Sequence, residues 1–140
     1  MVINLYKIGL ALIIGLFIGY EREKADKPAG LRSCVLVIIS MTFLMILNLR
    51  LLDLFGITGL DMARIPSYCI AGIGFLGSGV IILNKKGIEG VTTASTLLAL
   101  VVIGLLCGLG EFLLASIMGS ITFLVLNLKY IEVKLKKDNK

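Results

Sequence analysis

Long apolar runs alternate with short polar segments along the whole chain. The runs cover residues of about 3–20, 34–52, 66–83, 91–108 and 111–128. Each is close to the roughly 17–25 residues that a helix needs to cross a bilayer. We interpret the last two runs as separate helices, because residues 108–111, Gly-Leu-Gly-Glu, combine helix-weakening glycines with a carboxylate. The pattern predicts an all-α fold, a polytopic membrane bundle of five transmembrane helices over residues 1–128.

The composition agrees with a membrane protein and excludes most other classes. Hydrophobic residues make up 58% of the chain and charged residues 16%, against roughly a quarter charged in soluble domains. A soluble domain of this size could not hide so much apolar surface, so soluble enzymes and nucleic-acid-binding domains are excluded. There is no histidine, and Cys34, Cys69 and Cys107 each lie in an apolar run, so we expect no zinc site or disulfide. No nucleophile–base pair is evident, and we expect no enzymatic activity.

The basic residues predict an orientation. With the C-terminus inside, eleven of the fourteen lysines and arginines fall on the cytoplasmic side, where positive residues are favoured. We therefore expect an N-out/C-in topology with residues 129–140 as a basic cytoplasmic tail. Lys7, Arg50 and Arg64 remain outside, and Arg50 is interpreted as ending the second span with its side chain reaching the interface. The inner cations are Arg22, Lys24, Lys27, Arg32, Lys85, Lys86 and five lysines of the tail.

A dense polar insert at residues 21–32 separates the first two runs. It holds seven of the 23 charged residues and continues into Pro-Ala-Gly-Leu-Arg. Glu21 and Glu23 would lie on opposite faces of a helix, so one site could not take both without distortion. Glu21 and Arg22 are candidates for a buried ion pair, and the bland alternative is that the insert is only a connecting loop. Its candidate functional residues are Glu21, Arg22, Glu23 and Arg32, with Pro28 and Gly30 as structural residues.

The third run is rich in glycine. Gly72, Gly74 and Gly77 match G-x-G-x-x-G formally, but no preceding strand or βαβ unit supports a dinucleotide site. Small residues four apart let membrane helices pack closely, and so many glycines also favour a broken helix near an ion or substrate site. We expect packing or hinge roles for them. The glycines concerned are Gly72, Gly74, Gly77, Gly79, Gly104 and Gly108, with further small-residue pairs at Gly15/Gly19 and Ala115/Gly119.

Two further polar groups lie near the ends of spans. Thr92, Thr93 and Thr96 cluster at the start of the fourth run, where their hydroxyls could cap the helix, bond to a neighbouring helix or line a polar path. Asp61 and Arg64 could pair on one helical face at the start of the third run. Magnesium prefers one or two carboxylates and retains water. If the protein holds a metal at all, Glu21 and Asp61 are the candidate ligands.

Three blocks of the sequence occur in a characteristic order. They are Glu21-Arg22-Glu23 with Lys27-Pro28-Ala29-Gly30-Leu31-Arg32, then Asp61-x-x-Arg64-Ile65 with residues 72–81, then residues 90–96, and Gly104 with Gly108-x-Gly110 continues the match. Together they closely resemble the MgtC/SapB family over most of residues 9–119. The chain departs from the family pattern at several positions, and Glu89 reverses the charge of a usual arginine. The other departures are Ser33-Cys34 for Thr-His, Tyr68 for Gln and Leu98 for an aromatic residue.

The resemblance implies a multi-pass protein of the bacterial plasma membrane, connected with growth in low magnesium and, in pathogens, with survival inside macrophages. It implies a non-enzymatic regulator that acts on other membrane proteins, such as ATP synthase or ion and phosphate transporters. Many members continue into a soluble cytoplasmic domain, which we do not expect in this short form.

The alternative hypothesis is that the protein itself transports Mg²⁺ or another cation. Either way, we expect the lipid bilayer as partner, a homo-oligomer with the dimer as its expected state, contacts with other membrane proteins, and no nucleic acid. We expect no cofactor beyond an association with Mg²⁺.

Overall fold

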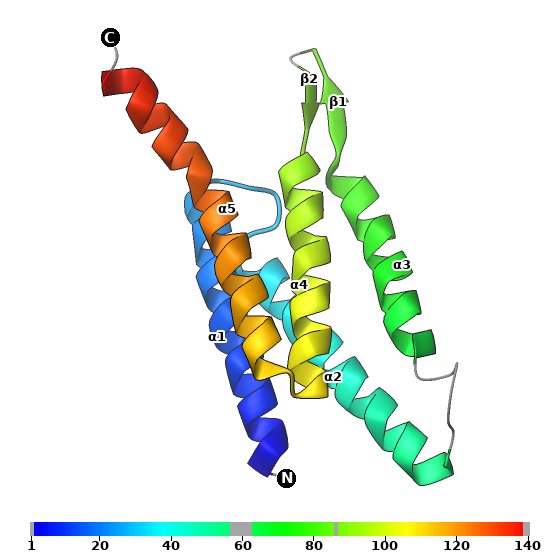
Figure 1. Ribbon diagram of the computed structural model, residues 1–140. Helices are drawn as coiled ribbons and strands as arrows, with labels where there is room; N and C mark the ends of the chain where they lie inside the picture. Colours follow the sequence, from blue (N-terminus) through cyan, green and yellow to red (C-terminus); the bar gives the residue numbers. More distant parts are fainter. Residues whose placement is uncertain (1, 57–62, 86, 139–140) are drawn as a thin grey trace.

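The computed structural model describes residues 2–56, 63–85 and 87–138 of the chain (Figure 1). These described residues form five helices and one two-stranded hairpin. The elements are α1 (Val2–Lys24), α2 (Leu31–Phe55), α3 (Arg64–Val80), β1 (Ile82–Asn84), β2 (Gly87–Glu89), α4 (Val91–Leu109) and α5 (Phe112–Asp138). The helical fold agrees with the prediction from the apolar runs.

The helices run in alternating directions (Figure 1). The α1–α2 loop, the hairpin and the end of α5 lie at one end of the bundle, which we call the hairpin end. The start of α1 and the α4–α5 turn lie at the other, the N-terminal end. Within the described residues, three helices are long and apolar enough to cross a membrane: residues 4–24 of α1, α2 and α4. The apolar part of α5, Phe112–Leu128, is shorter, and α3 has 17 residues.

Helix α4 lies at the centre of the bundle and contacts each of the other four helices. The core between α1, α2 and α4 contains fully buried aliphatic side chains, among them Ile18, Ile38, Leu100 and Ile103. Helix α3 lies at the outer edge in Figure 1, where it packs against α4 and more lightly against α2. Burial is thus concentrated along α4, and many outward-facing side chains of the other helices are apolar and exposed, as a lipid-facing surface requires.

Two helix ends have the same backbone geometry. At the end of α1, Asp26 has φ 53°, and its N–H and that of Lys27 donate to the carbonyls of Glu23 and Arg22, both at 3.0 Å. At the end of α4, Gly110 has φ 96°. Its N–H donates to the Cys107 carbonyl and the N–H of Glu111 donates to the Leu106 carbonyl, both at 3.0 Å. These are Schellman motifs, which end a helix with a left-handed residue, usually glycine.

One predicted boundary is wrong. The third apolar run does not remain helical to residue 83, because α3 ends at Val80 and the chain forms the hairpin, with Leu83 paired to Ile88. The residue that fixes this corner is Gly90, at φ 88°, where an added Cβ would overlap the Val80 carbonyl. The tail predicted at 129–140 is helical as far as Asp138, because α5 continues to that residue, while the apolar part of α5 ends at Leu128. Its lysine- and leucine-containing sequence suits a helix.

The glycine-rich third run forms one continuous helix, which does not support the alternative of a broken helix there. The tight glycine contacts lie elsewhere. A Cβ added to Gly104 would lie 2.6 Å from the Ile38 carbonyl oxygen, and one added to Gly108 would lie 2.5 Å from Met45 Cβ. Gly15 and Gly19 of α1 are equally close to α2. By contrast, none of the described residues lies within 4 Å of a Cβ added to Gly72, Gly74 or Gly79, and Gly77 meets Ala94 at an ordinary 3.5 Å.

Candidate functional site at the junction of α1 and α2

The last two turns of α1 hold a buried ion pair. Glu21 and Arg22 have only 7% and 3% of their surface exposed, and Arg22 Nε lies 3.5 Å from Glu21 Oε2. Neither of these two atoms has a hydrogen-bond partner among the described residues. Buried charges are normally both paired and hydrogen-bonded. Because these two atoms lack hydrogen bonds to the described residues, the ion pair offsets only part of the free energy lost when the charges leave water. The predicted pair is therefore present, with atoms still able to accept and donate hydrogen bonds.

Glu23 is exposed and has a different task from Glu21. Its Oε2 accepts a hydrogen bond of 2.8 Å from the backbone N–H of Leu31, the first residue of α2. A carboxylate there satisfies an orphan N–H and favours the positive end of the helix dipole. Gly30 permits this approach, since its added Cβ would lie 3.0 Å from the same oxygen. The two glutamates thus occupy separate environments, as expected from their opposite faces.

The loop between the helices is closed by backbone contacts. Gly19 packs against the start of α2, where an added Cβ would lie 2.8 Å from Leu31 Cα. Ala29 is buried, and its carbonyl accepts a weak hydrogen bond of 3.6 Å from the Cys34 thiol. Pro28 and Arg32 are exposed. The insert therefore presents Pro28 and Arg32 outward while holding the Glu21–Arg22 pair inside.

The threonine cluster sits at the start of α4. Thr93 and Thr96 are 1% and 3% exposed, whereas Thr92 is exposed. Thr96 Oγ1 donates to the Thr92 carbonyl at 2.7 Å. The N-cap of α4 is Gly90, without a side-chain capping bond, so the capping interpretation of these hydroxyls is wrong. Of the predicted Asp61–Arg64 pair, Arg64 is exposed at the first residue of α3, and Asp61 lies outside the described residues.

Sequence reasoning missed two polar residues that join helices. Lys7 of α1 is 8% exposed, and its Nζ donates to the carbonyls of Gly108 and Leu109 at 2.8 and 3.5 Å. These carbonyls belong to the end of α4, where helix carbonyls lack intrahelical partners. The buried Thr42 hydroxyl donates to the carbonyls of Ile38 (2.8 Å) and, across to α4, Gly104 (3.1 Å). In the sequence, the position of Lys7 within an apolar run indicated that it needs a partner. Nothing in the sequence indicated the Thr42 contact.

The described residues form no cluster of three or more histidine, cysteine, aspartate or glutamate side chains that could hold a metal. Glu21 is the one candidate ligand whose surroundings can be described, and its nearest charged neighbour there is Arg22. A cation at this position would have to compete with the guanidinium for the carboxylate. The arrangement suits charge pairing inside the bundle better than magnesium binding by Glu21 alone.

Comparison with known proteins gives a consistent answer. The sequence profile of the MgtC family matches residues 8–133. The chain is 31% identical to protein SapB of Bacillus subtilis over 95% of this chain and 58% of that protein. It is 37% identical to protein MgtC of Salmonella typhimurium over 73% of this chain and 42% of that protein. An uncharacterized protein of Haemophilus influenzae is 33% identical over 85% of this chain and 52% of its own length.

The chain thus spans about half the length of the curated relatives that it matches. No solved structure matches it. The family profile covers the polar insert, the glycine-rich helix and the threonine cluster together, in a chain with helices suited to crossing a membrane. This protein is a member of the MgtC family.

Proposed function

We propose that this protein is a multi-pass protein of the bacterial plasma membrane that regulates other membrane proteins by helix–helix contact and catalyses no reaction. Its role would be in adaptation to low magnesium and, in a pathogen, in intracellular survival, as its resemblance to MgtC implies. The targets would be machines such as ATP synthase or ion and phosphate transporters. Membership of the MgtC family and the three long apolar helices support the membrane setting.

The topology that we propose has five spans with the N-terminus outside. Helix α3 would be the shortest span at about 26 Å, close to the roughly 30 Å of a hydrocarbon core. The alternating helix directions support it, because Arg22, Lys24 and Lys85 all lie at the hairpin end. A single cysteine at position 85, in a chain with Cys34, Cys69 and Cys107 replaced by alanine, should react with a membrane-impermeant thiol reagent only in inverted vesicles. Labelling in intact cells would refute the orientation.

The observation that carries the regulatory proposal is the packing between α2 and α4. At Gly104 and Gly108 the two helices approach within contact of backbone and Cβ atoms, and Thr42 bonds across the same interface. The residues beside it, including Ile38, Leu100 and Cys107, are fully buried. The centre of one protomer is therefore filled with apolar side chains and leaves little room for a hydrated ion.

The surface that we propose for partners is the outer face of α3. Tyr68 and Phe75 are 67% and 78% exposed, and Gly72 and Gly79 lie on the same helical face, where no described residue comes within 4 Å of an added Cβ. Exposed aromatics beside glycines present knobs and gaps that a second helix can fill. We propose that this face mediates a homodimer or contacts a regulated membrane protein.

Ion flux and crosslinking together test the proposal. Purified protein in liposomes loaded with a magnesium-sensitive dye should give the same Mg²⁺ entry as protein-free liposomes. A photoreactive residue at Phe75 should give discrete adducts in native membranes, whereas one at Leu36, which is 67% exposed on α2, should not. Mg²⁺ flux that is lost in Glu21→Ala and Asp61→Ala would refute the regulator and establish the transporter.

A further inference from the structure

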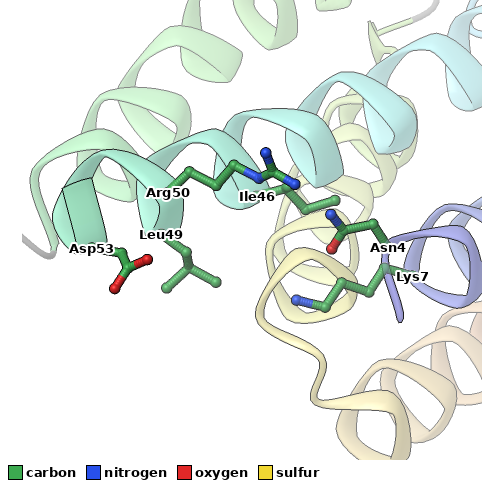
Figure 2. A pocket seen from close by; sticks show the side chains of 6 residues that line it. All are labelled: Asn4, Lys7, Ile46, Leu49, Arg50 and Asp53. Carbon is green, nitrogen blue, oxygen red and sulfur yellow. The ribbon is translucent and has the colours of Figure 1, made fainter. Parts of the chain in front are cut away.

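A cleft of about 220 Å³ opens between α1 and α2 at the N-terminal end of the bundle (Figure 2). It is far larger than the about 30 Å³ that one water molecule occupies in the liquid. We propose that this cleft binds a phosphate group, held by Lys7 and Arg50. Six residues line it: Asn4 and Lys7 from α1, and Ile46, Leu49, Arg50 and Asp53 from α2.

Lys7 supplies a fixed positive charge at the base of the cleft. Its side chain is buried, and its short hydrogen bond to the Gly108 carbonyl holds the ammonium group in place. An ammonium group has three N–H donors, and the bonds to Gly108 and Leu109 use at most two of them. Lys7 forms no ion pair with a carboxylate among the described residues. A positive charge and a hydrogen-bond donor are therefore left for a ligand in the cleft.

Arg50 provides the second cation. Figure 2 shows its guanidinium extending toward Asn4, while Asp53 lies at the opposite end of the cleft beyond Leu49. In the described part of the chain, Arg50 and Asp53 form no ion pair with each other or with another residue. The cleft therefore carries two positive charges and one negative charge. Its net charge is positive, and the negative charge, on Asp53, lies at the end of the cleft away from Asn4.

The hydrogen-bond donors in the cleft suit the oxygen atoms of a phosphate group. A guanidinium offers a planar fork that matches phosphate oxygens, and an ammonium group adds a point charge. Asn4 adds amide N–H donors and lies in the first turn of α1, where the helix dipole also favours an anion. Ile46 and Leu49 give the cleft an apolar wall, which suits the glycerol and acyl parts of a phospholipid. The phosphate group can thus come from a lipid headgroup or from free phosphate.

Binding can be measured as the shift of the unfolding midpoint of the purified protein in maltoside micelles. One arm titrates inorganic phosphate against chloride at equal ionic strength. The other titrates phosphatidylglycerol against diacylglycerol, which lacks the phosphate. Arg50→Gln should weaken binding roughly ten- to hundredfold, and Asp53→Asn should tighten it. Lys24→Gln, with the same charge change at the exposed far end of α1, should bind like the unaltered protein.

A response to both inorganic phosphate and phosphatidylglycerol supports a site for the phosphate group itself. A response to phosphatidylglycerol alone supports a lipid headgroup site. No response in either arm overturns the proposal, and so does an equal loss in Arg50→Gln and Lys24→Gln, which would indicate diffuse attraction to a basic protein. Because Arg50 and Asp53 are exposed, neither variant should fail to fold, and the test does not depend on altering the buried Lys7.

Discussion

Replacement of Gly104 by alanine tests whether the contact between α2 and α4 limits stability. The added methyl group would lie 2.6 Å from the Ile38 carbonyl oxygen and 2.8 Å from Met41 Cβ. The first distance is about 0.8 Å short of an ordinary van der Waals contact, and a backbone carbonyl cannot rotate away as a side chain can. The two helices must therefore move apart along an interface that also carries the Thr42 hydrogen bond.

The expected magnitude follows from two opposing effects. Overpacking costs roughly 1–3 kcal/mol, and the upper part of this range applies where backbone is the obstacle. Alanine in place of glycine favours a helix by about 1 kcal/mol. We therefore expect Gly104→Ala to lower the free energy of unfolding by about 2 kcal/mol. The same substitution at Gly9 or Gly72, where nothing lies within 4 Å, should instead raise it by up to about 1 kcal/mol.

Unfolding of the purified protein in mixed micelles, driven by dodecyl sulfate and followed by far-ultraviolet circular dichroism, measures these differences. Gly9→Ala and Gly72→Ala are matched controls on two other helices, with identical chemistry and open surroundings. If Gly104→Ala were as stable as the unaltered protein, the helices would not be in the tight contact described. If all three variants lost stability equally, the loss could not be attributed to the close packing at Gly104.

Three further predictions use the same unfolding measurement. Lys7→Met should lower the free energy of unfolding by roughly 1–3 kcal/mol, because the Gly108 carbonyl loses its donor; no change would mean that water or lipid replaces the lysine. Asp26→Gly should raise it by about 1 kcal/mol, since glycine adopts the left-handed conformation without strain, and a loss would show that the aspartate side chain has a task of its own. Glu21→Gln should cost roughly 3–5 kcal/mol by leaving Arg22 buried and unpaired. Adding Arg22→Met should restore much of that loss, and simple additivity of the two changes would contradict direct pairing.

The pattern of apolar residues predicted the helices, but it did not predict the hairpin or which helices pack together. It located five helices because lipid-facing helices are apolar on all sides, and the Gly108–Glu111 break was visible as glycines beside a charge. It missed the hairpin because Ile81, Ile82 and Leu83 extend the apolar run, and a short apolar stretch does not distinguish strand from helix. A glycine spacing identifies a face that can pack closely, but not its partner. Among the described residues, Gly104 has a packing partner on another helix and Gly72 does not.

The candidate site was predictable to a similar degree. The Glu21–Arg22 pair followed from charges at the end of an apolar run, because such charges need a partner when they are buried. The capping bond from Leu31 to Glu23 depends on how the chain turns at Asp26, and residue type alone does not predict a left-handed aspartate. The acceptors of Lys7 lie on another helix, so no local pattern could reveal them.

The contact between Lys7 and Gly108 also has a consequence for biosynthesis. The two residues are 101 positions apart, which corresponds to about 5–20 s of synthesis at common bacterial and eukaryotic elongation rates. During that interval the first helix enters the membrane with a charged side chain whose final acceptors have not yet been made. We expect α1 to insert incompletely, or to stay close to the translocation machinery, until α4 arrives. Full insertion of α1 would then depend on the synthesis of α4.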